Sequence, residues 1–486
     1  MRFKFVHAAD LHLDAVLPFA GDAEGAELWR EAPFLALRRL TDFCIASGAS
    51  LLLLSGDVYD SRQGSLKARL ELREACQRLN QTGIRVFWAR GNHDPLGEDN
   101  SFINWPDNLT IFNTVGQSYA LSWENGGLGE PRPLEAGAGL SEAAGETVLV
   151  HGISHAGPRE SDNLALRLRA HLENLSLPAK GADRFSLGVL HCNVGGQFRL
   201  GNAGGHENYA PCSLGDLTAA PVDYWALGHI HQPGLLSESP YVAYAGSPQG
   251  LHVRESGERG CWLGEVEDGR LVDLNFYHLA PLRWERLELD LAGLEDPLAE
   301  DSAVSLEELE EFIVREIQNL AAAVASEESS QPQSGQQSGE AGGNHASREL
   351  ALRVVLGGRS VLDGVLRKTG NLGDLAARLN RRLEEWDGTA PRPRIKDLKL
   401  DTRPAVDLDE MLAGDNLVAE TMRRALAVAY SSIDDSKLRE CLALLDVLYA
   451  SNKAEAWLSE LKPGLTELSE LAREAAAVCL DLFEVE

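Results

Sequence analysis

Seven side chains of metal-ligand type recur in a fixed order through the first half of this 486-residue sequence. They are Asp10, His12, Asp57, Asn92, His191, His229 and His231. Carboxylate and carboxamide oxygens mixed with imidazole nitrogens suit manganese, iron or zinc rather than a thiolate site. Two cations held close together would stabilise the attacking and leaving oxygens of an in-line phosphoryl displacement. The residue types therefore predict a dinuclear metal centre suited to phosphoester hydrolysis.

A histidine beside the ligands is a candidate for proton transfer. His93 directly follows Asn92, which already supplies an oxygen, so its imidazole is not needed as a ligand. We expect His93 to contact the phosphate and to protonate the leaving oxygen. Asp94 follows it and is predicted to orient the imidazole. His93 and Asp94 are thus the predicted catalytic pair.

The elements that must position these residues follow an α/β pattern over residues 1–280, where short β-rich runs alternate with helical stretches. The expected strands are Phe3–Ala8, Leu51–Ser55, Arg85–Ala89, Thr147–His151, Ser186–His191 and Tyr224–Leu227. The expected helices are Pro33–Ile45, with proline at its first position, Leu66–Gln81 and Asp162–Asn174. The ligand residues fall at or just past strand ends, where ligands gather in open α/β sheets.

Residues 281–404 are predicted to form a small α/β capping domain, and residues 405–486 a helical region. The expected capping elements are strands Arg283–Leu289, Leu350–Leu356 and Arg394–Asp401 and helices Ser305–Val324 and Leu372–Trp386. A Ser/Gln/Gly/Glu-rich segment over residues 325–347 predicts a disordered loop. The apolar stripes of residues 405–486 are explained either by intramolecular packing or by docking of a partner.

Composition restricts the class of protein. Hydrophobic residues make up 44% of the chain, and its seven cysteines form no CxxC pair, so we expect reduced thiols in the cytoplasm. No apolar stretch approaches the length that spans a bilayer. The net charge of −29 is unusual for a protein that handles nucleic acid, but residues 351–400 form a basic island that includes Arg378, Arg381 and Arg382. This island is either a surface for DNA phosphates or an ordinary solvated face.

The residues around the ligands add a resemblance. The blocks His7–Asp14, Ser55–Asp60, Gly91–Asp94 and Ala226–His231 resemble those of the calcineurin-like metallophosphoesterase superfamily. Within it, they look like DNA double-strand-break repair nucleases of the bacterial SbcD type and their YhaO-like exonuclease relatives. This resemblance implies a four-layer β-sandwich flanked by helices, covering about residues 1–280.

The resemblance also implies roles. Two manganese ions are expected, one held by Asp10, His12, Asp57 and His231, and the other by Asp57, Asn92, His191 and His229, with His93 as the catalytic acid. It further implies a DNA exonuclease or endonuclease subunit in DNA repair, a homodimer, and an ATPase partner of the structural-maintenance (SMC) coiled-coil type. A phosphomonoesterase or a cyclic-nucleotide phosphodiesterase on the same fold is the alternative enzyme. A scaffold without activity is a third hypothesis, against which the intact ligand set argues.

Other histidines are expected to have simpler roles. His7 and His151 are predicted to be structural residues. His155, His206 and His252 are expected on loops, either exposed to solvent or lining a substrate groove.

Overall fold

The computed structural model describes residues 1–17, 23–60, 65–98, 103–124, 126–135, 145–175, 183–195, 208–294, 305–330, 347–386, 391–404 and a few positions between 413 and 423. Residues 1–358 and 365–401 form one compact unit, and residues 359–364 with 402–486 form a second. The predicted helical region 405–486 lies outside the described residues apart from those few positions. Its structure and the predicted boundaries at 280 and 404 therefore stay predictions.

The first sheet carries the N-terminal ligands and has six strands in the order β14-β13-β1-β2-β3-β4. Their bounds are β1 Arg2–Ala8, β2 Leu51–Leu54, β3 Arg85–Trp88, β4 Leu109–Ile111, β13 Gly260–Glu267 and β14 Arg270–His278. Strands β1 to β4 run parallel, whereas β13 pairs antiparallel with β1 and with β14. All four residues of β2 are buried, as expected of a parallel strand covered on both faces.

The second sheet has eight strands, with the order β11-β12-β10-β9-β8-β5-β6 and β7 paired to β5. Their bounds are β5 Gln117–Glu124, β6 Gly127–Leu128, β7 Arg132–Pro133, β8 Thr147–Gly152, β9 Arg184–His191, β10 Tyr224–Gly228, β11 Gly234–Glu238 and β12 Tyr241–Tyr244. Strands β8, β9, β10 and β12 are parallel neighbours. The carboxyl ends of β9 and β10 therefore open on the same edge of this sheet.

The two sheets pack face to face. Alternate side chains of β1 divide between two cores: Phe3 and Phe5 belong to the core between the sheets, and Val6 and Ala8 to the core under the helices. Phe5 lies 4.8 Å from Tyr224 of the second sheet, measured between ring centroids. Each such buried aromatic side chain stabilises the packing by about 1.5–3 kcal/mol.

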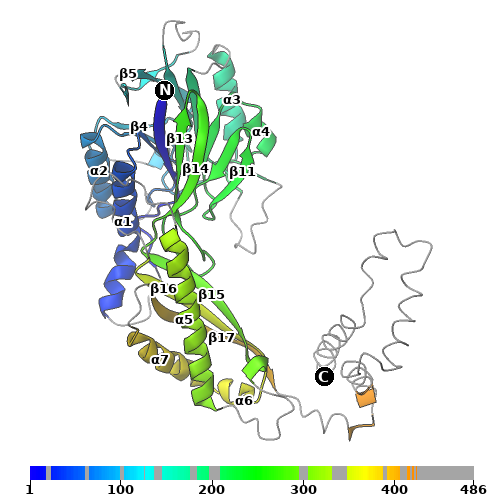
Figure 1. The fold of residues 1–486 in the computed structure, drawn as a ribbon. Helices are drawn as coiled ribbons and strands as arrows, with labels where there is room; N and C mark the ends of the chain where they lie inside the picture. The colour runs from blue at the N-terminus through cyan, green and yellow to red at the C-terminus, as the bar shows by residue number, and fades with distance from the viewer. Residues whose placement is uncertain are drawn as a thin grey trace, which may run out of the picture. The chain divides into compact units, whose positions relative to one another are not determined.

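Helices cover the outer face of each sheet (Figure 1). On the first sheet lie α1, Ala23–Ala46, and α2, Leu66–Gln81; on the second lie α3, Leu164–Asn174, and α4, Leu214–Thr218. Single turns of 3-10 helix occur at Leu96–Glu98 and Leu291–Leu294. The four-layer α/β sandwich implied by the sequence is confirmed. The predicted helix start at Pro33 is wrong, because Pro33 lies inside α1.

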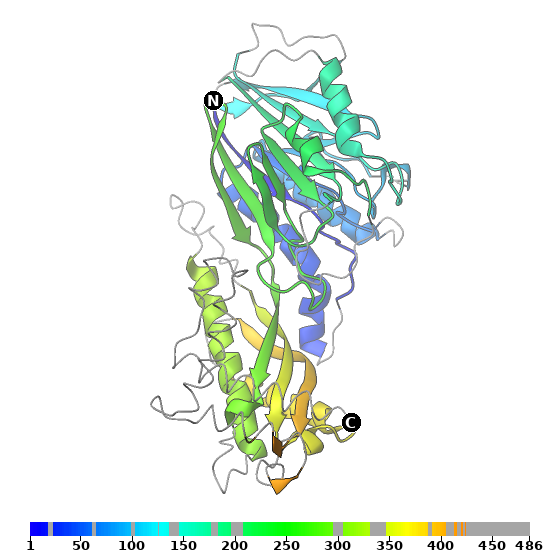
Figure 2. The same ribbon diagram turned by 90° about the vertical axis from the view of Figure 1, so that its right-hand side faces the viewer.

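A third sheet, β15-β16-β17, lies in the range predicted as the capping domain, and we name it the capping sheet. Its strands are β15 Leu282–Asp290, β16 Glu349–Ser360 and β17 Arg392–Pro404, and its helices are α5 Leu306–Ser330, α6 Asp363–Leu366 and α7 Asn371–Glu384. Figures 1 and 2 show α5 lying along this sheet. Each predicted capping strand and helix is present within a few residues of its expected bounds.

Residues 325–330 of the predicted disordered loop are helical. Helix α5 continues to Ser330, because Glu327 and Glu328 near its end pair with Arg283 of β15. Residues 331–346 of the predicted loop lie outside the described residues. Across the part of the chain that is described, no helix is both long and apolar enough to cross a membrane.

Candidate metal centre

The predicted ligands follow the carboxyl ends of strands from both sheets. Asp10 and His12 come after β1, Asp57 after β2 and Asn92 after β3. His191 is the last residue of β9, whereas His229 and His231 follow β10. The edges of the two sheets are joined by the Ser55 hydroxyl, which donates to the carbonyl of Ala226 at 2.9 Å. Residues as far apart in the chain as Asp10 and His231 therefore meet at one edge.

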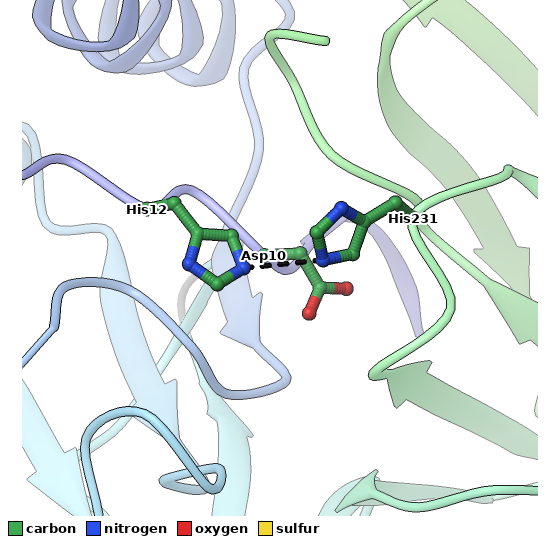
Figure 3. A group of neighbouring side chains, drawn as sticks. All are labelled: Asp10, His12 and His231. Atoms are coloured by element: carbon green, nitrogen blue, oxygen red, sulfur yellow. Dashed lines mark hydrogen bonds between the residues drawn. The ribbon is translucent and has the colours of Figure 1, made fainter. Parts of the chain in front are cut away.

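One group of candidate ligands joins Asp10, His12 and His231, whose ligand atoms all lie within 4.8 Å of one another (Figure 3). The two Nε2 atoms of His12 and His231 are 3.2 Å apart. On the other side of the His231 ring, Nδ1 lies 2.8 Å from Oε1 of Glu255. An imidazole that donates Nδ1–H to a carboxylate keeps the lone pair of Nε2 available for a cation.

A second group joins Asp10, Asp57 and His191. Nε2 of His191 lies 3.2 Å from Oδ2 of Asp57 and 3.0 Å from Oδ1 of Asn92. The backbone N–H of His229 donates to both carboxylate oxygens of Asp10 at 3.1 Å. The centroid of the His229 ring lies 5.3 Å from that of the His191 ring. The structure thus brings all seven predicted ligands together, with Asp10 rather than Asp57 present in both groups.

Backbone strain is concentrated at these residues. Of the six described non-glycine residues with positive φ, four are predicted ligands: Asp10 at 52°, His12 at 42°, Asp57 at 53° and His229 at 97°. Such conformations cost of order 1–3 kcal/mol each and persist where the surrounding structure enforces them. Their clustering here is typical of a site that pre-organises its ligands.

Glycine allows the backbone to approach the second group closely. A Cβ on Gly91 would lie 2.8 Å from Nδ1 of His191 and closer still to the carboxylate of Asp57. A Cβ on Gly228 would clash with the carbonyl oxygen of Ser55 and lie 3.0 Å from the same Nδ1. A side chain at either position would therefore force the loops that carry the ligands apart.

The charges of the site suit a cation. Burial raises the pKa of Asp10 to about 6, and the Asp57 carboxylate acts in the same direction against the opposing effect of His191 and His231. Burial lowers the pKa of His191, but the charge of Asp57 and the hydrogen bond with it outweigh this effect and raise that pKa to about 9. Burial lowers the pKa of His12 to about 3. Buried carboxylates beside imidazoles, aimed at common points, form a donor set that fits divalent cations.

His93 differs from the ligands because its side chain is 45% exposed. Its backbone N–H donates to Oδ1 of Asp57 at 2.8 Å, and its ring lies 5.0 Å from the ring of His12. Nδ1 of His93 is 3.6 Å from Oδ2 of Asp60. The imidazole therefore lies at the exposed rim of a buried ligand cluster.

The carboxylate of Asp94, which is predicted to orient the His93 imidazole, contacts backbone amides in the structure. Its carboxylate is fully buried and accepts the backbone N–H groups of Gly91 at 2.6 Å, Val58 at 2.8 Å and Asp57 at 3.2 Å. Burial raises its pKa to about 6, with the Asp57 charge adding to the effect. Asp94 thus supports the loops that carry the ligands, and the carboxylate beside the His93 ring is that of Asp60.

Sequence reasoning missed the carboxylate behind His231, because no local motif marks Glu255. It also misplaced His155. This side chain is fully buried, and its Nε2 lies 2.7 Å from the carbonyl oxygen of His191. His252 is 54% exposed, as expected of a loop residue, and His206 lies outside the described residues. His151 is buried between the hydroxyls of Ser118 and Ser186, in agreement with its structural interpretation.

Several basic side chains of the predicted island form ion pairs within the capping part. Arg378 pairs with Glu310 at 2.5 Å, Arg353 with Asp397 at 2.7 Å and Arg394 with Glu349 at 2.7 Å. Arg381 is exposed on α7. Part of the island is therefore structural.

Comparison with known families agrees with this geometry. Residues 3–233 match the family described as calcineurin-like phosphoesterase, a range that contains all seven predicted ligands and His93. Residues 3–233 are a calcineurin-like phosphoesterase domain. Because the phosphoesterase domain implies a dinuclear divalent-metal centre, the two ligand groups are its candidate cation sites.

Two curated relatives extend beyond the phosphoesterase domain. The chain is 32% identical over 292 residues to the metallophosphoesterase YhaO of Bacillus subtilis, a match that covers 59% of this chain and 63% of YhaO. It is 23% identical over 306 residues to a subunit of the nuclease SbcCD of Staphylococcus epidermidis, covering 61% of this chain and 74% of that protein. The match to YhaO thus spans less than two thirds of that protein.

A solved structure of a dimetal phosphatase from Danio rerio is also similar, with 13% identity and a TM-score of 0.28. It covers 54% of this chain and 92% of the phosphatase. This likeness is distant.

Proposed function

We propose that the chain is a metal-dependent nuclease subunit that hydrolyses DNA phosphodiesters in DNA repair. The observation that carries this proposal is the exposed imidazole of His93 at the rim of the buried ligand cluster. There, a phosphodiester could reach the ligands and a proton donor at once. The similarity to the SbcCD nuclease of Staphylococcus epidermidis supports DNA as the substrate.

In this proposal Asp10, His12 and His231 hold one cation, while Asp57, Asn92, His191 and His229 hold the other. Asp10, which lies in both ligand groups, is the proposed shared ligand. Manganese is the proposed metal, in agreement with the mixed oxygen and nitrogen donors. When bound, the two cations would supply positive charge to the phosphate oxygens and lower the pKa of the attacking water.

His93 is the proposed general acid. Its Nδ1 lies 3.6 Å from Oδ2 of Asp60, and Nε2 is the nitrogen proposed to donate a proton to the leaving oxygen. The hydrogen bond from the backbone of His93 to Asp57 ties this donor to a ligand, so both hold their positions relative to the same phosphate. Asp60, not Asp94, is proposed to stabilise the protonated imidazole.

We further propose that the chain acts as a homodimer with a coiled-coil ATPase of the SMC type, in the cytoplasm. The Staphylococcus relative is one subunit of a nuclease, which supports the existence of a second kind of subunit. Residues 405–486 are the proposed docking region for that ATPase. Exposed basic side chains on α7, such as Arg381, are proposed to contact DNA phosphates.

The test is release of nucleotides from end-labelled duplex and single-stranded DNA, with manganese or with chelator. His93→Ala should abolish most of the release without weakening manganese binding, because His93 is not a ligand in this proposal. His171→Ala on α3 is the matched control, since His171 lies in the outer helix layer and bonds to Ser118. Turnover of small phosphomonoesters or cyclic nucleotides with DNA left intact would refute the nuclease.

A further inference from the structure

The segment between β12 and β13 contacts both the candidate metal centre and the first capping strand. Its Glu255 is only 7% exposed and uses both carboxylate oxygens. Oε1 lies 2.8 Å from Nδ1 of His231, and Oε2 accepts the backbone N–H of Leu251 at 2.7 Å. Glu255 therefore joins a candidate ligand to the backbone of this segment.

The contact with Glu255 determines which nitrogen of His231 faces the cation site. Because Nδ1 faces the carboxylate, Nε2 points to the group shared with Asp10 and His12 (Figure 3). Carboxylates behind ligating imidazoles fix both the tautomer and the ring orientation. Without Glu255, the ring of His231 could rotate away from the other ligands.

A buried arginine, Arg259, binds the backbone of both His231 and Glu255. Arg259 is 1% exposed and donates to the carbonyl of His231 and, at 3.1 Å, to the carbonyl of Glu255. It also donates to the side-chain oxygen of Gln232 at 2.9 Å. The spacing between the two backbones is thus set by one planar group with fixed donor directions.

The same segment is hydrogen-bonded to β15 on either side of Glu255. The indole N–H of Trp284 donates to the carbonyl of Gly250 at 3.0 Å, and the N–H of Gly257 donates to the carbonyl of Trp284 at 3.0 Å. The amide of Gln249 donates to the carbonyl of Leu282 at 2.9 Å and accepts its N–H at 3.1 Å. Movement of β15 must therefore move the segment that carries Glu255.

We propose that Glu255 is a positioning residue for His231 and that β15 holds Glu255 in place, so that the position of the capping sheet controls how tightly the metal centre binds its cation. The inference rests on the proposed metal centre. It gives the capping sheet a role of its own, separate from the DNA contact proposed for α7. A ligand or partner that shifts this sheet would change metal occupancy without touching any ligand.

The first test is titration of the metal-free full chain with Mn²⁺, followed by calorimetry and by electron paramagnetic resonance. Loss of a carboxylate behind a ligating histidine weakens metal binding by roughly 10–100-fold, and we expect this of Glu255→Ala. Glu255→Gln keeps one acceptor oxygen and should have a smaller effect. The spectrum of coupled Mn²⁺ ions should give way to that of isolated Mn²⁺. Glu288→Ala, which changes an exposed carboxylate on β15, is the matched control.

The second test is a double-mutant cycle between the capping strand and Glu255. Trp284→Phe keeps an aromatic ring but removes the N–H donor to Gly250, so Mn²⁺ affinity should fall by about 2–10-fold. In the Glu255→Ala background the same change should have little further effect. Trp29→Phe is the control. It also removes an indole N–H next to the ring of Trp284, but this N–H donates to Glu349 of β16.

The outcomes separate the two proposals. A wild-type chain that binds no Mn²⁺ refutes the metal centre itself. If the wild type binds Mn²⁺ and Glu255→Ala binds it equally well, Glu255 does not position His231. If Trp284→Phe has the same effect with and without Glu255, the capping strand does not act through this residue. Circular dichroism of each metal-free variant checks that the fold is retained.

Discussion

Replacing Asp94 by asparagine separates a structural role from a catalytic one. The buried carboxylate accepts three backbone N–H groups, from Asp57, Val58 and Gly91. Asparagine has one acceptor oxygen, so its –NH₂ group must face at least one of these donors. A buried donor without an acceptor costs about 1–3 kcal/mol, and we expect Asp94→Asn to lower the free energy of unfolding by that amount. Asp94→Ala leaves all three donors without the acceptor and should lower it by more than about 4 kcal/mol.

The assay is urea unfolding of the metal-free chain followed by circular dichroism, in parallel with DNA hydrolysis in manganese. Asp162→Asn is the control, because that carboxylate is 65% exposed. Lower stability of Asp94→Asn, with partial hydrolytic activity once the variant is folded, agrees with the structure. If Asp94→Asn is as stable as the wild type but loses as much activity as His93→Ala, Asp94 acts on the imidazole. The reasoning from its hydrogen bonds would then be refuted.

Three further predictions concern pH, metal and DNA. Burial lowers the pKa of His151 to about 3, so the ring stays neutral in the folded state, whereas the unfolded chain takes up a proton below about pH 6.5. The free energy of unfolding should therefore fall as the pH drops from about 6.5 towards 3, by up to about 1.4 kcal/mol per pH unit. His151→Gln should make acid unfolding shallower over that window, and an unchanged slope would contradict this. Manganese at 100 times its Kd should stabilise the folded chain by about 2.7 kcal/mol in thermal unfolding, whereas an unchanged Tm would argue against binding to the folded state. Arg381→Glu should weaken DNA binding and reduce its salt dependence, with Arg315→Glu on α5 as the control; equal binding by the two variants would remove α7 from the DNA surface.

Local patterns predicted the elements well where burial on both faces forces a continuous apolar run. Strand β2, with four buried leucines, is the clearest example. The start of α1 was not predictable in this way, because proline favours a first helical position. The helix begins at Ala23 instead, and Trp29 near its start packs against Trp284 of the capping sheet at 5.1 Å between ring centroids. Tertiary packing therefore outweighed a local preference.

The end of α5 shows the same limit. A serine- and glutamate-rich segment indicates a loop by composition, yet Glu327 and Glu328 extend the helix. Both pair with Arg283, which lies 44 and 45 positions away in the chain. Composition cannot reveal a partner at that separation.

By itself, the sequence determined the chemistry of the donor set, the order of the ligands and their positions at strand ends, because residue type and strand periodicity are local properties. Only the tertiary structure decided that Asp10 lies in both ligand groups, that Asp94 binds backbone amides and that Glu255 holds His231. Each of these depends on contacts between loops of different strands, at distances and angles that the spacing along the chain does not encode. The physical reason is that the loops converge only when the two sheets pack together and bury their shared core.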